Sequence, residues 1–245
     1  RNILHPHVKG AMHPYEDVPL VLVSGVGRSG TTALRHAFSA HPLVDSTASE
    51  NNIIFDVTDT ALHNCTYWSR KGTMRVVQPA YNRQFQLLLL NLLWPEPRRG
   101  KRRPAALVAS SDMTVDRAAY LCQIFPSCKI PYIVRNGIEV VASRTAHENF
   151  KDVSFEEHCH IWTRAHAMAL WGEGHDALVV VRHEALRRSP KETLAAALDA
   201  CGLPFHEECL KQVVGKTFHP TQNENESREA SSDLEQRHKR WERWD

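Results

Sequence analysis

The chain has 245 residues, of which 42% are hydrophobic, and its formal net charge at pH 7 is only +2. This length and apolar content allow one sizeable core, so we predict a single domain over residues 1–245. The nearly neutral charge argues against a nucleic-acid-binding protein, which more often shows a strong basic excess.

Strand-like and helix-like patterns alternate along the chain. Short apolar, β-branched runs predict strands at residues 18–25, 106–110, 129–134 and 177–184. Helical patterns predict helices at residues 30–40, 80–93, 114–125, 137–147, 154–172 and 189–200. The alternation predicts an α/β fold with three α/β/α layers and a mostly parallel central sheet, with its core in residues 18–205. A ligand is then expected at the carboxyl edge of the strands.

The longest apolar run, residues 85–93, is far shorter than the ~20 residues that cross a bilayer. Gln86 and Asn91 also interrupt it. We therefore predict a buried helix here and no membrane span. The chain begins with Arg1 rather than Met, which leaves open whether a targeting segment once preceded it.

The first predicted strand runs into the glycine-rich stretch GVGRSGTT, residues 25–32. Its glycines fit both the Gly-x-Gly-x-x-Gly fingerprint of dinucleotide-binding proteins and most of a Walker loop. In either case backbone amides and the N-terminus of the next helix converge on an anion. The candidate anion-binding residues of this loop are Gly25, Gly27, Arg28, Ser29, Gly30, Thr31 and Thr32.

The residues that follow the last glycine help to identify the anion. A Walker loop continues with Lys and then Ser or Thr, whereas here Thr31 and Thr32 follow Gly30 directly. The cation inside the loop is Arg28, whose planar fork suits phosphate or sulfate oxygens but cannot bind a metal. We therefore predict a phosphate ester site without an obligatory Mg²⁺.

A second anion-binding pattern follows the predicted strand at 129–134. Arg135 stands at the end of this strand, and Ser143 lies eight residues later in the next predicted helix. The Arg can bind one compact anion by charge, and the Ser can add a hydrogen bond. Taken alone, the segment is equally compatible with an Arg that pairs with a surface carboxylate.

Three segments together resemble the sulfotransferases that use 3′-phosphoadenosine 5′-phosphosulfate (PAPS). GVGRSGTTALRHAFSAHP is similar to their loop and helix for the 5′-phosphosulfate, and FPSCKIPYIVRNGIEVVASR to their 3′-phosphate element. VVVRHEALRRSPKETLAAALDACGLPF is similar to their closing strand, helix and Gly-Leu-Pro turn. The resemblance implies PAPS as donor co-substrate, with Arg135 and Ser143 at its 3′-phosphate and no metal required.

The Arg-Ser-Gly-Thr-Thr loop is most similar to that of the tyrosylprotein sulfotransferases and their bacterial and carbohydrate-sulfating relatives. Those enzymes carry a catalytic Glu past a His-Pro turn, and here Glu50 follows His41-Pro42. The resemblance implies Glu50 as general base and Arg28 as the catalytic cation. Taken alone, Glu50 could instead favour the start of a helix near Asn51. His36 is a rival base, but it lies inside the first predicted helix.

The chain departs from these relatives after the predicted strand at 106–110. The tyrosylprotein enzymes have Lys-Asp-Pro at this point, whereas this chain has Ser111, Asp112 and Met113. Their Lys helps to neutralise the transition state, so either Arg28 carries more of that task or another cation substitutes. Arg70 and Lys71 are candidates that the sequence does not rank.

Residues 51–105 are predicted to form an acceptor-side insertion. Tyr67 and Trp68 either line the acceptor pocket or pack in the core. The basic run at 98–103 is either a solvated loop or a funnel for anionic acceptors. The charged tail, residues 220–245, is either a terminal helix or a lid. The sequence leaves open whether the acceptor hydroxyl belongs to a sugar, a tyrosyl peptide or a small molecule. It also leaves open the compartment, which is the cytoplasm for a bacterial chain and the Golgi lumen for a truncated eukaryotic enzyme.

No metal site is predicted. His158 and His160 lie two apart in a predicted helix, where their side chains diverge by roughly 200°. The six cysteines show no C-x-x-C pair and leave open whether any of them pair.

Three alternative functions remain. A P-loop kinase or nucleotide hydrolase would need a Lys after Gly30, which this chain does not have. A nicotinamide-dependent oxidoreductase would use Asp45 or Glu50 to bind a ribose, but this function leaves Arg135 unexplained. A PAPS-binding module with impaired catalysis would account for the missing Lys at Ser111.

Overall fold

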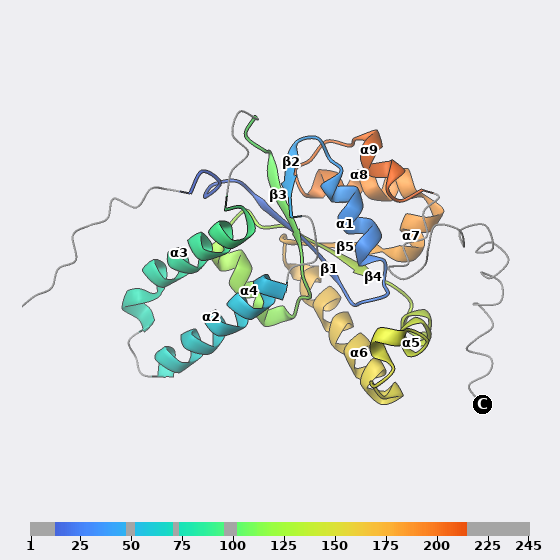
Figure 1. The fold of residues 1–245 in the computed structure, drawn as a ribbon, viewed down its shortest axis with the longest axis horizontal. Helices are drawn as coiled ribbons and strands as arrows, with labels where there is room; N and C mark the ends of the chain where they lie inside the picture. The colour runs from blue at the N-terminus through green and yellow to red at the C-terminus, as the bar shows by residue number, and fades with distance from the viewer. Residues whose placement is uncertain (1–12, 48–51, 71–73, 96–101, 215–245) are drawn as a thin grey trace, which may run out of the picture.

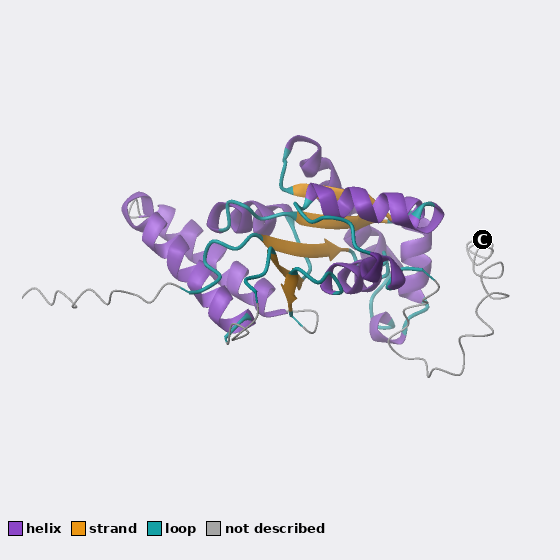
Figure 2. Ribbon diagram, turned by 90° about the horizontal axis from the view of Figure 1, so that it is seen from above, coloured by secondary structure: helices purple, strands orange, loops and turns teal. Residues whose placement is uncertain are grey.

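The computed structural model describes residues 13–47, 52–70, 74–95 and 102–214. Within them, five parallel strands form one central sheet, and helices pack on both of its faces (Figures 1 and 2). The strands lie in the order β2-β3-β1-β4-β5, and they span Leu20–Gly25 (β1), Val44–Ser46 (β2), Ala106–Ser110 (β3), Ile130–Val134 (β4) and Leu178–Arg182 (β5). The predicted α/β fold with a parallel sheet is confirmed.

Helices connect the strands in chain order. They are α1 Thr31–Ser39, α2 Asn52–Arg70, α3 Met74–Leu93, α4 Val115–Ile124, α5 Gly137–Thr145, α6 Phe155–Trp171, α7 His183–Arg188, α8 Pro190–Ala200 and α9 Glu207–Lys211. Two 3₁₀ turns, Glu148–Phe150 and Gly172–Gly174, flank α6. None of the helices in the described part of the chain has the length and hydropathy of a bilayer-spanning segment.

The sheet divides the hydrophobic core into two layers, because successive side chains of a strand point to opposite faces. Leu20 and Leu22 of β1 pack with residues of α2, α3, α4 and α6 on one face. Val21 and Val23 pack with residues of α1, α7, α8 and α9 on the other. All four side chains are buried, and each contributes about 1.5–3 kcal/mol by leaving water. Both faces of β1 are thus covered, which explains its continuous apolar sequence.

The chain leaves neighbouring strands toward opposite faces of the sheet. After β1 it enters α1 on one face, whereas after β3 and β4 it enters α4 and the α5–α6 pair, of which α4 and α6 pack on the other face. Since β1 lies between β3 and β4, the connections diverge at the carboxyl end of β1, which is where open α/β sheets bind ligands. β1, β3 and β4 all end at this edge, and its role in ligand binding stays a prediction.

Several predicted boundaries were wrong. The structure adds β2, which the sequence analysis missed because three residues at the sheet edge give too short a pattern. The last predicted strand, 177–184, ends at Arg182, because the chain turns into α7 at His183. The helix predicted from residue 80 begins at Met74 and contains Pro79, a residue that normally signals a boundary.

The predicted acceptor-side segment, 51–105, is largely helical. Its helices α2 and α3 contact each other and both contact α4, so they form a layer beside the sheet rather than part of it (Figure 1). Arg117 of α4 fastens α2 by donating to both carboxylate oxygens of Asp59, at 2.6 and 2.7 Å. The role of this segment in acceptor binding stays a prediction.

Candidate functional site

The loop between β1 and α1 requires glycine at two positions. Gly25 has φ 151°, and a Cβ there would lie 2.6 Å from the carbonyl oxygen of Ile133. Gly30 has φ 101°, and a Cβ there would lie 3.0 Å from Cδ2 of His183. Between them Arg28 adopts φ 80°, a conformation that costs a non-glycine residue of order 1–3 kcal/mol. Backbone strain of this kind concentrates at ligand-binding loops.

The N-terminus of α1 has hydrogen-bond donors to offer. Gly30 is its N-cap and supplies no side-chain cap, so the amides of the first turn lack the usual intramolecular acceptor. The Ser29 hydroxyl is fully buried and has no partner among the described residues. The Ser29 amide, in contrast, donates to the carbonyl of Val26 at 3.0 Å and is used by the turn. Amides, a hydroxyl and the helix dipole fit a bound anion.

The two anion-binding patterns predicted from the sequence meet in space. Arg28 donates from Nε to Oγ of Ser143 at 3.1 Å. Arg135 donates from one terminal nitrogen to the carbonyl oxygen of Arg28 at 3.0 Å. Residues more than 100 positions apart therefore join the β1 loop to the carboxyl end of β4. Thr31 and Thr32 lie in the first turn of α1, beside the same loop.

Arg135 is also held by residues that the sequence analysis did not single out. Its Nε and second terminal nitrogen donate to one carboxylate oxygen of Glu139, at 2.8 and 2.5 Å. The indole of Trp162 donates to the Arg135 carbonyl at 3.1 Å. Asn136 caps α5 by accepting from the amides of Ile138 and Glu139. The signal for the ion pair was the i, i+4 spacing of Arg135, just before α5, and Glu139 in its first turn.

His183 also lies at this edge of the sheet and was not predicted from the sequence as a site residue. It follows β5 directly and its ring lies against Gly30. Burial lowers the pKa of His183 to about 4, and the charge of Arg135 acts in the same direction. The imidazole is therefore neutral at pH 7. The sequence placed His183 inside a strand, which hid its position at the strand end.

The end of β3 holds an acid and no lysine. Ser111 is buried, and part of the Asp112 side chain reaches solvent. The protein atoms around Asp112 nevertheless raise the pKa of its carboxyl group, while Arg144 and Arg117 act in the opposite direction. Arg144 lies in the last turn of α5, and 6% of its surface is exposed.

Some predicted residues lie outside the described residues. Glu50, the predicted general base, and Lys71 are among them, as is most of the basic run at 98–103 and the tail at 220–245. The same holds for the side chains of Trp68 and Arg70, whereas Tyr67 is described and is 50% exposed. The role of Glu50 stays a prediction.

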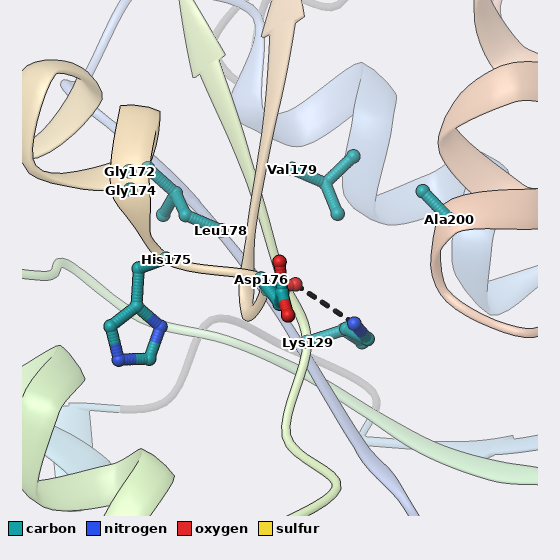
Figure 3. A pocket seen from close by; sticks show the side chains of 8 residues that line it. All are labelled: Lys129, Gly172, Gly174, His175, Asp176, Leu178, Val179 and Ala200. Carbon is teal, nitrogen blue, oxygen red and sulfur yellow. Dashed lines mark hydrogen bonds between the residues drawn. The ribbon is translucent and has the colours of Figure 1, made fainter.

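A hollow of about 630 Å³ lies at the other edge of the sheet (Figure 3). It is lined by Lys129, Gly172, Gly174, His175, Asp176, Leu178, Val179 and Ala200. Lys129 and Asp176 precede β4 and β5, so the hollow is at the amino ends of these strands. The Lys129 ammonium already donates to the Asp176 carbonyl at 2.8 Å. This hollow lacks the helix N-terminus and the arginines of the carboxyl edge.

Metal-ligating residues do not gather in the described part of the chain, where no group of three or more His, Cys, Asp or Glu could hold an ion. His158 and His160 lie on α6 as predicted, and His158 is buried whereas His160 is exposed. All six cysteines are described and are free thiols. The Cys128 thiol donates to the carbonyl oxygen of Lys129 at 3.9 Å.

Comparison with known proteins connects this geometry to one family. A family model described as Sulfotransferase family matches residues 19–207. The chain is 25% identical over 206 residues to a protein-tyrosine sulfotransferase of Drosophila melanogaster, covering 79% of this chain and 40% of the relative. It is 26% identical over 219 residues to protein-tyrosine sulfotransferase 1 of Danio rerio, covering 82% of this chain and 58% of the relative. The chain thus spans roughly half the length of these relatives.

Solved structures show the same fold. A sulfotransferase domain from the curacin biosynthetic pathway has a TM-score of 0.56 at 15% identity, covering 86% of this chain and 82% of that domain. A sulfotransferase domain from the Synechococcus PCC 7002 olefin synthase has a TM-score of 0.55 at 20% identity, covering 93% of this chain and 88% of that domain.

Proposed function

The chain belongs to the sulfotransferase family, and from that premise we propose that it transfers a sulfuryl group from PAPS to an acceptor hydroxyl. The observation that carries the proposal is the meeting of Arg28, Ser143 and Arg135 at the uncapped N-terminus of α1. PAPS carries two anionic groups, a 3′-phosphate and a 5′-phosphosulfate. Two anion-binding elements side by side match that charge pattern.

The β1 loop is proposed to hold the 5′-phosphosulfate. Arg28, the Ser29 hydroxyl and the amides of the first turn of α1 would bind its oxygens, with Thr31 and Thr32 as further donors. The donor supplies an activated sulfuryl group whose transfer leaves 3′-phosphoadenosine 5′-phosphate. Arg28 and the dipole of α1 stabilise negative charge at the loop, which is the main task in this chemistry.

The β4–α5 element is proposed to hold the 3′-phosphate through Arg135 and Ser143. Both residues face the β1 loop, since each contacts Arg28. A phosphate here would replace the contacts that Arg135 makes with Glu139. The neutral His183 adds no positive charge of its own beside the site.

Glu50 is proposed as the general base that removes the proton of the acceptor hydroxyl. A hydroxyl is a poor nucleophile at neutral pH, and a positioned base typically contributes 10²–10⁴-fold to the rate. The proposal rests on the place of Glu50 in the sequence after His41-Pro42. His36 is a weaker candidate, because it lies on the last turn of α1, away from the N-terminal end that faces the anion.

The relatives named for protein tyrosine favour a tyrosyl peptide among the possible acceptors. A sugar or a small-molecule hydroxyl would fit the same donor chemistry. A P-loop kinase is disfavoured by the absence of Lys after Gly30, and a nicotinamide-dependent enzyme leaves the joined set of Arg28, Arg135 and Ser143 unexplained. A PAPS-binding module with impaired catalysis remains the second candidate, because Ser111 replaces a catalytic lysine of the family.

The function is tested by transfer of label from [³⁵S]PAPS to tyrosyl peptides, saccharides and small hydroxyl compounds. We expect transfer to at least one class, and Glu50→Gln should lower it at least ~10²-fold with nucleotide binding unchanged. Glu156→Gln, an exposed acid of α6 outside the predicted acceptor-side segment, is the matched control and should transfer normally. Normal turnover by Glu50→Gln would reject Glu50 as base, and donor binding without transfer would favour the impaired module.

A further inference from the structure

The carboxyl edge of β3 carries Ser111 at the position where the tyrosylprotein sulfotransferases have a lysine. Asp112 follows the buried Ser111, and Arg117 on the next helix is already used. Arg117 binds both oxygens of Asp59, and its guanidinium stacks 3.4 Å above the ring of Phe55. Another positive group must therefore face the transferred group if Arg28 does not act alone.

Arg144 is a buried arginine close to this edge. It lies in the last turn of α5 with 6% of its surface exposed, whereas arginines are rarely buried unless they have a partner. Its guanidinium lies 4.1 Å above the ring of Phe150. Among the described residues its one hydrogen bond runs from Nε to Nδ1 of His158, at 3.2 Å.

His158 holds Arg144 without neutralising it. An imidazole nitrogen accepts a hydrogen bond only when it is unprotonated, and burial together with the charge of Arg144 lowers the pKa of His158. No carboxylate in the described part of the chain forms an ion pair with Arg144. The Asp112 carboxylate attracts the Arg144 guanidinium electrostatically without forming an ion pair with it. The positive charge of Arg144 is therefore fixed in place but not paired.

This fixed charge touches the donor loop. A Cβ on Gly27 would lie 3.1 Å from a terminal nitrogen of Arg144 and 3.8 Å from the ring of Phe150. Gly27 thus leaves the space that the guanidinium fills. The preceding residue of α5 is Ser143, which binds Arg28. Consecutive residues of one helix therefore reach two neighbouring residues of the loop.

We propose that the Arg144 guanidinium, held by His158 beside Gly27, is the second cation of the transfer site and faces the sulfuryl group of the bound donor. The proposal deepens the proposed function and rests on it. Arg144 takes over the task of the lysine that this chain lacks at Ser111, from the last turn of α5. The two terminal nitrogens remain available to sulfuryl oxygens because Nε alone is bound to His158.

Nucleotide binding tests the proposal without turnover. 3′-Phosphoadenosine 5′-phosphate lacks the sulfuryl group, so dissociation constants for it and for PAPS, measured by calorimetry without acceptor, isolate that group. We expect Arg144→Met to weaken PAPS binding roughly 10–100-fold, because a charge-assisted hydrogen bond is lost. The dissociation constant of 3′-phosphoadenosine 5′-phosphate should change less than ~2-fold. Met keeps an unbranched stem over Phe150. Arg164→Met, an exposed position on α6, is the control.

The outcomes separate the two proposals. Equal weakening of both nucleotides, or no change in either, would overturn the role of Arg144. If Arg144→Met does not fold, Arg144→Lys is measured instead. It should lower the preference for PAPS by a smaller factor and leave binding of 3′-phosphoadenosine 5′-phosphate unaffected. Equal losses for both nucleotides would again overturn the role. Failure of the unaltered protein to bind either nucleotide would reject the proposed function itself.

Discussion

Two elements at the carboxyl edge of the sheet are built in opposite ways. At the end of β1, α1 begins without a side-chain cap, and Gly30 adopts a left-handed conformation. At the end of β4, α5 is capped by Asn136, and Arg135 is bound to Glu139. The first element offers uncapped amides to the proposed 5′-phosphosulfate. The second would exchange its contacts with Glu139 to bind the proposed 3′-phosphate, so the two should respond differently to substitution.

The largest effect is expected in the β1 loop. Gly25→Ala forces a Cβ to within 2.6 Å of the Ile133 carbonyl at a left-handed φ. We expect a loss of about 3 kcal/mol in the free energy of unfolding, or roughly 6–12 °C in Tm. Gly174→Ala is the matched control, because nothing lies within 4 Å of its Cβ. Equal Tm values for the two variants would contradict the packing described for the loop.

The next effect distinguishes the two elements by ligand. Arg135→Ala should weaken binding of 3′-phosphoadenosine 5′-phosphate roughly 10–100-fold, because a charged contact to the 3′-phosphate is lost. Binding of adenosine 5′-phosphate should change less than ~3-fold. Titration calorimetry with both nucleotides measures the difference. Equal losses would mean that Arg135 supports the loop through Arg28 and does not bind the 3′-phosphate.

A smaller effect is expected at Glu139. Its carboxylate occupies two nitrogens of Arg135 and would repel a phosphate. Glu139→Gln should therefore tighten binding of 3′-phosphoadenosine 5′-phosphate about 3-fold, with adenosine 5′-phosphate unchanged. If the variant binds the first nucleotide more weakly, Glu139 orients Arg135 for the phosphate, and the two elements are less different than described.

The smallest effect concerns pH. The pKa of His183 is about 4 in the folded protein and 6.5 as its ordinary value, so the unfolded chain binds more protons between these limits. Stability should fall as the pH drops from 6.5 toward 4. His183→Gln should lose less Tm than the unaltered protein between pH 7.5 and pH 5, by a few degrees. His160→Gln, an exposed His of α6, should behave like the unaltered protein.

The same contrast explains how much the sequence could reveal. The parallel sheet, the glycine loop, Arg135 and Ser143 were predictable, because strand patterns and spacing along the chain define them. The Arg135–Glu139 ion pair and the Asn136 cap of α5 also join residues two to four positions apart in the sequence. His183 and Arg144 were not predicted, because each reaches Gly30 or Gly27 only after segments more than 100 residues apart have packed together.

The most direct test of the central claim is thermal stabilisation by 3′-phosphoadenosine 5′-phosphate in EDTA, compared with ATP and Mg²⁺ and with NAD. A ligand at 100 times its dissociation constant adds about 2.7 kcal/mol, which raises Tm by several degrees. The account predicts a shift with the 3′-phosphorylated nucleotide alone, unaffected by EDTA. A shift only with ATP and Mg²⁺, or only with NAD, would contradict it.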